Sequence, residues 1–239
     1  MLPCNGLAMG NGILTRRKMD EIFSAERIFF AGGREWRIGL ADMDRLWETM
    51  TEREGEERAP YWNEIWPSSL ALADWLFERK EEIRERRCLD MGCGLGFTAL
   101  LGRWLGADVL AMDYEEEAVE LARHNAEKNG VTGVRWRTMD WREPELPEGS
   151  VDFLWAADIM YEAEAAEPIA GFLRHALALH GKAWIAEPGR TVFRHLPKIL
   201  PSFGLSAEIV RKTPIRPLIP QSVPVPVTIW EIKRKLNNN

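Results

Sequence analysis

Short apolar runs alternate with amphipathic stretches along most of the chain, and the two patterns have the lengths of strands and helices. Apolar runs that predict strands end just before Gly92 and recur near residues 108–113, 134–141, 151–157, 182–186, 205–212 and 225–232. Amphipathic stretches predict helices near residues 67–77, 97–105, 115–129, 168–180 and 192–200. Helices between consecutive strands imply parallel crossovers, so the pattern predicts a doubly wound, mostly parallel, seven-stranded α/β sheet.

The last two strands differ from the others because no helix separates them. They are predicted to form an antiparallel hairpin that closes the sheet. The connection, residues 214–226, holds five prolines. Proline lacks an amide donor and is unsuited to a central strand or a helix, so this segment is expected to be a stiff loop. It is either a lid or a plain surface connection.

A separate hairpin is predicted ahead of the sheet, over residues 27–40. Apolar and charged side chains alternate there around the Gly32-Gly33 turn. Residues 1–20 and 51–58 lack such a pattern and are expected to be mobile. The predicted organisation is an N-terminal extension with a β-hairpin, residues 1–59, followed by one main domain, residues 60–236.

Composition narrows the class of function. With 239 residues, 46% of them hydrophobic, the chain can bury a full core but has no room for a second large domain. The net charge of −6 argues against a protein that holds a nucleic-acid backbone. No apolar stretch reaches the length of a membrane span. Composition leaves the oligomeric state open.

Cysteine and histidine usage adds two expectations. The three cysteines, Cys4, Cys88 and Cys93, are too few and too irregularly spaced for a disulfide framework, which favours a reducing compartment and a cytoplasmic location. The four histidines show no metal-ligand spacing, so no metal site is predicted.

The most specific chemistry lies between residues 88 and 113, where a glycine-rich turn joins a strand to a helix. Gly92, Gly94 and Gly96 allow the backbone to take positive φ and to approach a ligand closely. The next strand ends at Asp113, whose carboxylate can accept both hydroxyls of a ribose. This order predicts a site for the ribose and adenine of a nucleotide-like cofactor, with a plain structural turn as the alternative.

Asp90 argues against a nicotinamide dinucleotide. In the dinucleotide fingerprint the pattern is Gly-x-Gly-x-x-Gly, and a helix N-terminus faces a pyrophosphate. Here the pattern is Asp90-x-Gly92-x-Gly94-x-Gly96. A carboxylate ahead of the first glycine repels a pyrophosphate but attracts the ammonium group of a methionine moiety. Asp90 is therefore predicted to contribute to cofactor binding.

Further polar and aromatic residues follow the ends of other strands. Asp140 and Trp141 leave one strand, and Asp158 and Tyr161 leave the next. Because ligands bind beyond the carboxyl ends of the strands in an open parallel sheet, these side chains are expected near the glycine turn. Trp66 stands at the entrance of a helix opened by proline and can cover a ligand, with core packing as the alternative.

These segments resemble a known family. Trp66-Pro67, the glycine turn, Asp140-Trp141 and Ala157-Asp158-Ile159-Met160-Tyr161 are similar to family-16 protein methyltransferases, class I S-adenosylmethionine-dependent enzymes that mostly methylate lysine in other proteins. The segments 60–62 and Glu187-Pro188-Gly189-Arg190 further resemble the branch that modifies the β subunit of electron-transfer flavoprotein. That branch more typically has aspartate at the position of Glu187, and the hairpin resembles members acting on other proteins. The resemblance covers residues 27–232.

The resemblance implies a cofactor, a partner and residue roles. The cofactor would be S-adenosylmethionine, and the partner a protein that presents a lysine. Carried over by position, the cofactor contacts would be Trp66, Gly92, Gly94, Asp113, Trp141 and Ala157. Asp158 and Tyr161 would line the acceptor site. Our hypothesis is that Asp158 orients the ammonium and passes its proton to water, while Tyr161 and Trp62 form a partly apolar wall that favours the neutral amine.

Two other readings share these features. A small-molecule N-methyltransferase would have the same cofactor residues and a closed acceptor pocket. A non-enzymatic module would bind the cofactor without turnover. A nucleic-acid adenine methyltransferase is disfavoured because such enzymes usually carry Asn/Asp-Pro-Pro-Tyr where this chain has Asp158-Ile159-Met160-Tyr161.

Overall fold

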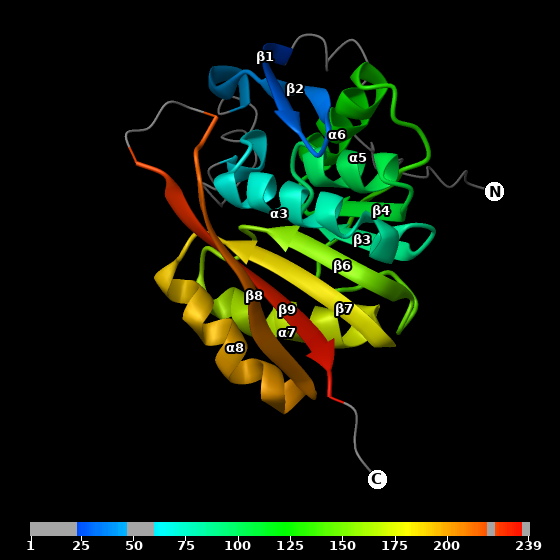
Figure 1. Cartoon of the computed structure of the whole chain (residues 1–239), viewed down its shortest axis with the longest axis vertical. Coiled ribbons are helices and arrows are strands. Elements are labelled where there is room, and N and C mark those ends of the chain that lie inside the picture. Colours follow the sequence, from blue (N-terminus) through cyan, green and yellow to red (C-terminus); the bar gives the residue numbers. More distant parts are fainter. Residues whose placement is uncertain (1–22, 47–59, 219–222, 236–239) are drawn as a thin grey trace, which may run out of the picture.

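A seven-stranded sheet forms the centre of the computed structural model, which describes residues 23–46, 60–218 and 223–235 (Figure 1). The strands are β3 (Arg87–Met91), β4 (Asp108–Asp113), β5 (Arg135–Thr138), β6 (Val151–Ala157), β7 (Leu177–Glu187), β8 (Leu205–Ile215) and β9 (Val225–Arg234). Their order in the sheet is β5-β4-β3-β6-β7-β9-β8. The first five run parallel, and β9 is antiparallel to both of its neighbours. The predicted fold class and the closing antiparallel hairpin are therefore confirmed.

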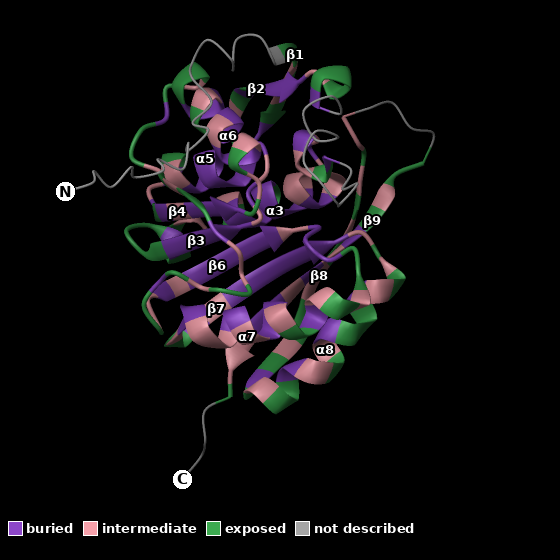
Figure 2. Cartoon of the chain, turned by 180° about the vertical axis from the view of Figure 1, so that it is seen from behind, coloured by how far each residue is buried: buried purple, intermediate pink, exposed green. Residues whose placement is uncertain are grey.

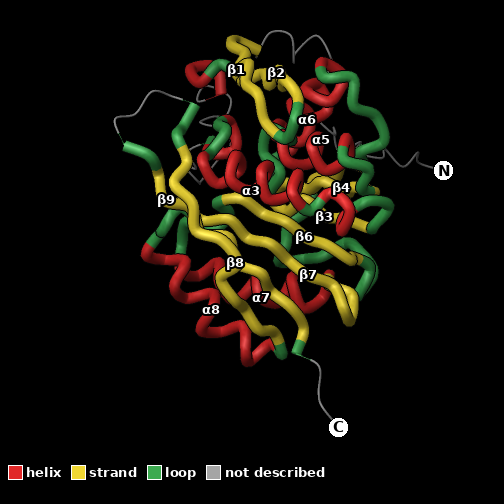
Figure 3. Tube along the Cα trace, in the orientation of Figure 1, coloured by secondary structure: helices red, strands yellow, loops and turns green. Residues whose placement is uncertain are grey.

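Helices cover both faces of the sheet (Figures 1 and 3). The α-helices are α3 (Pro67–Glu78), α4 (Lys80–Ile83), α5 (Phe97–Trp104), α6 (Glu116–Lys128), α7 (Ala166–Ala176) and α8 (His195–Ile199). Short 3-10 turns are η1 (Tyr61–Asn63), η2 (Ala163–Ala165), η3 (Thr191–Arg194) and η4 (Leu200–Phe203). As predicted, Pro67 is the first residue of α3, and Trp66 caps it in an extended conformation.

Side chains of the central strands alternate between two buried clusters, because successive residues of a strand point to opposite faces. Trp155 and Trp184 pack with α3 and α5, whereas Leu154 and Ile185 pack with α7 and α8. The middle of the sheet is therefore buried on both sides (Figure 2). This double burial explains the near-continuous apolar runs of β6 and β7 in the sequence.

The predicted N-terminal hairpin is confirmed as β1 (Phe23–Ala31) and β2 (Arg34–Ala41), joined by the Gly32-Gly33 turn. It packs over α5 and α6, with Trp36 and Ile38 fully buried on its inner side. Phe30 is 74% exposed on the outer side. The alternation of the sequence thus places one face of the hairpin in the main core.

Three asparagine side chains pair with the edge of β2 that does not face β1. Each side-chain amide accepts a hydrogen bond from the N–H and donates one to the C=O of the same β2 residue. The pairs are Asn129 with Arg37 (3.0 and 2.8 Å), Asn125 with Gly39 (2.8 and 3.3 Å) and Asn63 with Ala41 (2.8 and 2.9 Å). Arg37, Gly39 and Ala41 are thus satisfied as if another strand lay beside β2.

Predicted boundaries are wrong at two places. The helix predicted to reach residue 180 ends at Ala176, because β7 begins at Leu177, which pairs with Val151. The strand predicted over 134–141 is only β5, since the chain turns at Met139 towards the cavity described below. Leucine and alanine in short runs suit either element, so the local pattern could not place the end of α7.

The prolines at the sheet margin also differ from the prediction. Pro214 and Pro226 lie opposite each other at the ends of β8 and β9, rather than in a loop. Proline is tolerated there because β8 is the edge strand of the sheet and β9 begins to pair with β7 only at Thr228. Residues 219–222 of the connecting segment lie outside the described residues, as do residues 1–20 and 51–58, and the lid prediction stays a prediction. No helix among residues 23–46, 60–218 and 223–235 has both the length and the apolarity to cross a membrane.

Candidate functional site

The glycine turn follows β3 at the carboxyl edge of the sheet. Gly92, Gly94 and Gly96 have φ values of 68°, 49° and 81°, so all three use the left-handed region that side chains disfavour. Gly96 caps the N-terminus of α5. The sequence prediction of a strand, a positive-φ turn and a helix is confirmed.

The close approach that these glycines permit is made largely by the protein itself. An added Cβ would lie 2.8 Å from Cγ2 of Ile159 at Gly92, 3.0 Å from the carbonyl oxygen of Trp62 at Gly94, and 2.7 Å from Cβ of Ala122 at Gly96. The turn is therefore enclosed by the segment after β6, by η1 and by α6. Any side chain at these positions would push one of those elements away.

Asp113 joins the end of β4 to this turn. One carboxylate oxygen accepts a hydrogen bond from the Gly94 N–H at 2.8 Å, and the other accepts one from the Glu115 N–H at 3.1 Å. Burial raises the pKa of Asp113, and these backbone N–H groups partly offset that rise. The carboxylate is oriented by the turn and borders a cavity, which is the position expected for a ribose-binding acid.

Asp90 was predicted to contact the cofactor, but it lies buried beneath the glycine turn. Its carboxylate is 1% exposed and accepts a hydrogen bond from the Thr98 hydroxyl at 2.7 Å. Burial raises the pKa of Asp90 to about 7. Asp90 does not line the cavity, whereas Thr98 does. Asp90 thus supports the start of α5 from below, and its proposed contact with an ammonium group stays a prediction.

A cavity of about 630 Å³ lies at this edge, within the range of roughly 300–1,000 Å³ typical of small-molecule sites. Eight of the eleven predicted site residues line it: Trp66, Gly92, Gly94, Asp113, Asp140, Trp141, Ala157 and Tyr161. Asp90, Gly96 and Asp158 lie behind its wall. The convergence of strand ends therefore brings together segments that are far apart in the chain.

Carboxylates dominate the charge around this cavity. Besides Asp113 and Asp140, its lining includes Glu64, Glu115, Glu162 and Glu164. The lining contains one cation, Arg142, whose guanidinium pairs with Asp140 at 2.7 Å. The cavity therefore favours a positively charged ligand group.

Asp158 forms a salt bridge behind the cavity wall. Its side chain is 2% exposed, and its backbone has a φ of 54°. The Nε of Arg190 donates to one carboxylate oxygen at 2.5 Å, and an Nη donates to the other at 2.9 Å. This bidentate pair satisfies both oxygens of a buried carboxylate.

Aromatic rings surround the outer side of this pair. Tyr61 and Tyr161 stack with their centroids 5.1 Å apart. The Arg190 guanidinium carbon lies 5.5 Å from the Tyr161 centroid and 5.8 Å from the Trp66 centroid. The Trp66 indole N–H donates to the Tyr61 carbonyl at 2.8 Å, which fixes its plane. Three aromatic residues of the cavity wall thus gather around one cation.

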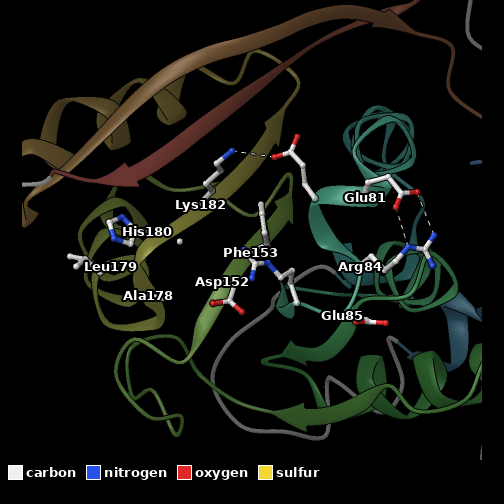
Figure 4. A pocket seen from close by; sticks show the side chains of 12 residues that line it. Glu81, Arg84, Glu85, Asp152, Phe153, Ala178, Leu179, His180 and Lys182 are labelled. Carbon is white, nitrogen blue, oxygen red and sulfur yellow. Dashed lines mark hydrogen bonds and ion pairs between the residues drawn. The ribbon is translucent and has the colours of Figure 1, made fainter.

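A second cavity, of about 880 Å³, lies at the opposite edge of the sheet, where β3, β6 and β7 begin (Figure 4). Its charged groups pair with one another: Arg84 with Glu81 at 3.2 Å, and Lys182 with Glu82 at 3.2 Å. It is remote from the glycine turn. None of the polar side chains that line it is buried. The first cavity is therefore the candidate site.

Sequence reasoning left several residues of the cavity wall, or directly behind it, unassigned. Arg190 follows β7 in the segment 187–190. It is 32 positions from Asp158 in the sequence, which gave no sign of a contact. Tyr61 was missed, although it lies five positions before Trp66, which was predicted to contact the cofactor. Two glutamates, Glu162 and Glu164, follow Tyr161 closely in the sequence, and they could have indicated an acidic rim.

Comparisons with known proteins agree with this geometry. Residues 88–179 match the family model described as "Methyltransferase domain". The electron transfer flavoprotein β subunit lysine methyltransferase of Xenopus laevis is 33% identical over 144 residues, which cover 58% of this chain and 56% of that protein. The EEF1A lysine methyltransferase 3 of Mus musculus is 28% identical, covering 55% of this chain and 60% of that protein. The chain thus spans little more than half the length of these curated relatives.

Solved structures show the same fold at low identity. A magnesium protoporphyrin IX methyltransferase from Synechocystis PCC 6803, with bound S-adenosylmethionine, aligns with a TM-score of 0.57 and 17% identity, covering 80% of this chain and 94% of that one. A putative RNA methyltransferase from Pyrococcus horikoshii aligns with a TM-score of 0.57 and 17% identity, covering 82% and 98%. The glycine turn and the acid at the end of β4 therefore lie in a fold that this chain shares with these solved methyltransferases.

Proposed function

We propose that the chain transfers a methyl group from S-adenosylmethionine to the side-chain nitrogen of a lysine in a protein substrate. The observation that carries this proposal is the contrast between the two ends of the cavity. One end has the glycine turn and Asp113, and the other has an acidic rim and a cluster of aromatic rings around a buried carboxylate. The first end suits a nucleoside, and the second suits a cation.

The cofactor end is supported by the chemistry of its groups. Asp113 presents carboxylate oxygens to the cavity while the Gly94 and Glu115 amides hold it in place. Trp66 and Trp141 offer flat apolar surfaces from two other elements. We propose that Gly92, Gly94 and Ala157, which line the cavity at the strand ends, complete this part of the site.

The acceptor end is supported by charge and by ring geometry. A lysine approaches as an ammonium ion, since its ordinary pKa is about 10.4. The carboxylates of Glu64, Glu162 and Glu164 attract that ion to the cavity. Tyr61, Tyr161 and Trp66 provide ring faces on which a cation is stabilised.

The transfer itself is an in-line displacement. S-adenosylmethionine supplies an electrophilic methyl group on a sulfonium. The lysine nitrogen must lose a proton before its lone pair can form the new C–N bond, while the electrons of the broken C–S bond stay on sulfur. The residues of this chain contribute by positioning the amine and by offering an apolar wall, Tyr161 and Trp62, that favours its neutral form. The released proton goes to water.

Relatives of the chain act on different side chains. One is named a lysine methyltransferase of electron transfer flavoprotein, another a histone-arginine methyltransferase, and another a histidine protein methyltransferase. We favour lysine because four relatives, 28–33% identical to this chain, are named lysine methyltransferases of the electron transfer flavoprotein β subunit. The rim of carboxylates suits a cationic acceptor, which a neutral histidine is not.

Incubation of the purified protein with radiolabelled S-adenosylmethionine and a cell lysate tests this proposal. A discrete labelled protein band is expected, and mass spectrometry of that band should place the methyl group on lysine. The Asp113→Ala variant should lose the label because its cofactor site is damaged. Label confined to small molecules would instead favour a metabolite N-methyltransferase. Cofactor binding without any labelled product would favour a binding module.

A further inference from the structure

We infer that Arg190 occupies the place of the acceptor ammonium, so that the incoming lysine binds by displacing the Arg190 guanidinium from Asp158. This inference rests on the proposed function, because it concerns the acceptor end of the same site. It assigns to Arg190 the role of a specificity-determining residue. An acceptor that carries no positive charge cannot replace it.

Asp158 is a buried carboxylate that is paired with a cation. Its carboxylate is 2% exposed, and both oxygens are engaged by Arg190. Leaving one member of a buried ion pair without its partner is strongly destabilising. Asp158 therefore favours a paired cation in the complex that the acceptor forms before it loses its proton. When Arg190 leaves, only another cation can take its place without that penalty.

The Arg190 guanidinium lies among aromatic rings of the cavity wall. It lies 5.5 Å from the Tyr161 ring and 5.8 Å from the Trp66 ring, and Tyr61 stacks on Tyr161. A carboxylate beside several ring faces is the environment that binds an ammonium or a methylated ammonium. All three rings line the candidate cavity. The internal cation and the acceptor cation therefore compete for the same groups.

The Arg190 side chain can move away from Asp158 while the backbone of Arg190 stays in place. Its side chain is 33% exposed, so it has a route to solvent that Asp158 lacks. The Glu187 carboxylate accepts hydrogen bonds from the N–H groups of Gly189 and Arg190, which fixes the turn. Displacement then requires rotation of one side chain, and the acceptor supplies the replacement charge.

This arrangement selects acceptors by charge. A lysine ammonium restores the pair that Arg190 gives up, whereas a hydroxyl or an amide leaves Asp158 unpaired. It also predicts that small free cations bind poorly to Asp158. Its carboxylate is already neutralised by a tethered cation, which a small free cation must outcompete.

Titration with n-butylammonium, a minimal lysine side chain, tests the inference without methyl transfer. The full chain is saturated with S-adenosylhomocysteine, and binding is followed by calorimetry. The Arg190→Gln variant should bind n-butylammonium about tenfold more tightly than the original protein, because the charged competitor is gone. The neutral probe n-butanol should show no such gain. Equal or weaker binding of n-butylammonium to Arg190→Gln would overturn the inference.

Two further variants separate competition from damage to the fold. Arg190→Lys keeps a tethered cation and should leave the affinity within about threefold of the original. Asp158→Asn combined with Arg190→Gln removes both charges and should abolish the gain. Thermal unfolding of each variant shows whether it is folded; if Arg190→Gln is not, the inference is decided by Arg190→Lys, where an affinity gain above tenfold would contradict it.

Kinetics with the methylated protein provide an independent measurement. Arg190→Gln should lower KM for the acceptor, whereas loss of a purely structural residue would lower kcat without lowering KM. If no protein is methylated but the n-butylammonium result holds, the proposed substrate is wrong and the displacement stands. If methylation is found but Arg190→Gln shows a raised KM and no affinity gain, the displacement is wrong and the proposed function stands.

Discussion

The side-chain amide of Asn125 pairs with both backbone groups of Gly39, 86 residues away in the sequence. Its amide nitrogen also donates to the Leu95 carbonyl of the glycine turn at 3.0 Å. Asn125 is fully buried on α6. One side chain therefore links the N-terminal hairpin, α6 and the candidate cofactor site.

Replacement of Asn125 by leucine should destabilise the protein by about 2–4 kcal/mol, because it leaves the N–H and C=O of Gly39 and the Leu95 carbonyl unsatisfied in the core. Urea unfolding at equilibrium measures this change. Asn129→Leu is the matched control, since Asn129 makes the same pair with Arg37 at an exposed position. Its effect should be below about 1.5 kcal/mol, and equal losses in the two variants would contradict the argument.

Gly94→Ala should weaken binding of S-adenosylhomocysteine by at least about tenfold. The new Cβ would lie 3.0 Å from the Trp62 carbonyl and would disturb the N–H that holds Asp113. Gly130→Ala is the control because Gly130 has a similar positive φ of 63° and open space around its Cα. It should cost stability but leave affinity unchanged. Calorimetric titration of both variants distinguishes the site effect from backbone strain.

Stability should fall as pH rises from about 4 to about 7. Burial raises the pKa of Asp90 to about 7 from an ordinary value of 3.8, so the folded protein keeps a proton that the unfolded chain has already lost. The contribution of this group is largest below pH 4 and is lost as pH approaches 7. The pKa of Asp113 is also raised by burial, which acts in the same direction.

The Asp90→Asn variant should show a shallower decline over that range, with the remainder due to Asp113. Urea unfolding at pH 4 and pH 7 gives the two free energies needed for each protein. An equally steep decline in Asp90→Asn and in the original protein would show that Asp90 does not hold the proton.

Tyr161 should act through its ring more than through its hydroxyl. The ring stacks on Tyr61 and faces the Arg190 guanidinium, and the side chain is 42% exposed. Tyr161→Ala should therefore weaken n-butylammonium binding to an Arg190→Gln background by about fivefold, in line with loss of one cation–π contact. Tyr161→Phe keeps the ring and should retain most of the affinity. Equal losses in both variants would assign the role to the hydroxyl.

The sequence by itself determined the order of the elements and the position of the glycine turn. Alternating apolar runs and amphipathic stretches arise from the periods of strand and helix, so they are legible without a structure. The positive-φ turn at Gly92, Gly94 and Gly96 has a local cause, and so has the acid that ends β4. Because strand ends in a parallel sheet meet at one edge, the cavity could be anticipated from Asp113, Asp140 and Tyr161.

Tertiary structure decided which way the side chains point and which distant groups meet. Asp90 leads the glycine turn in the sequence, yet its carboxylate turns to Thr98 and away from the cavity. Asp158 meets Arg190 only because β6 and β7 end side by side. The asparagines that complete β2 come from η1, from α6 and from the residue that follows α6, and no local pattern encodes such pairs. Periodicity fixes what each segment becomes, whereas packing of the whole chain fixes the partners of its polar atoms.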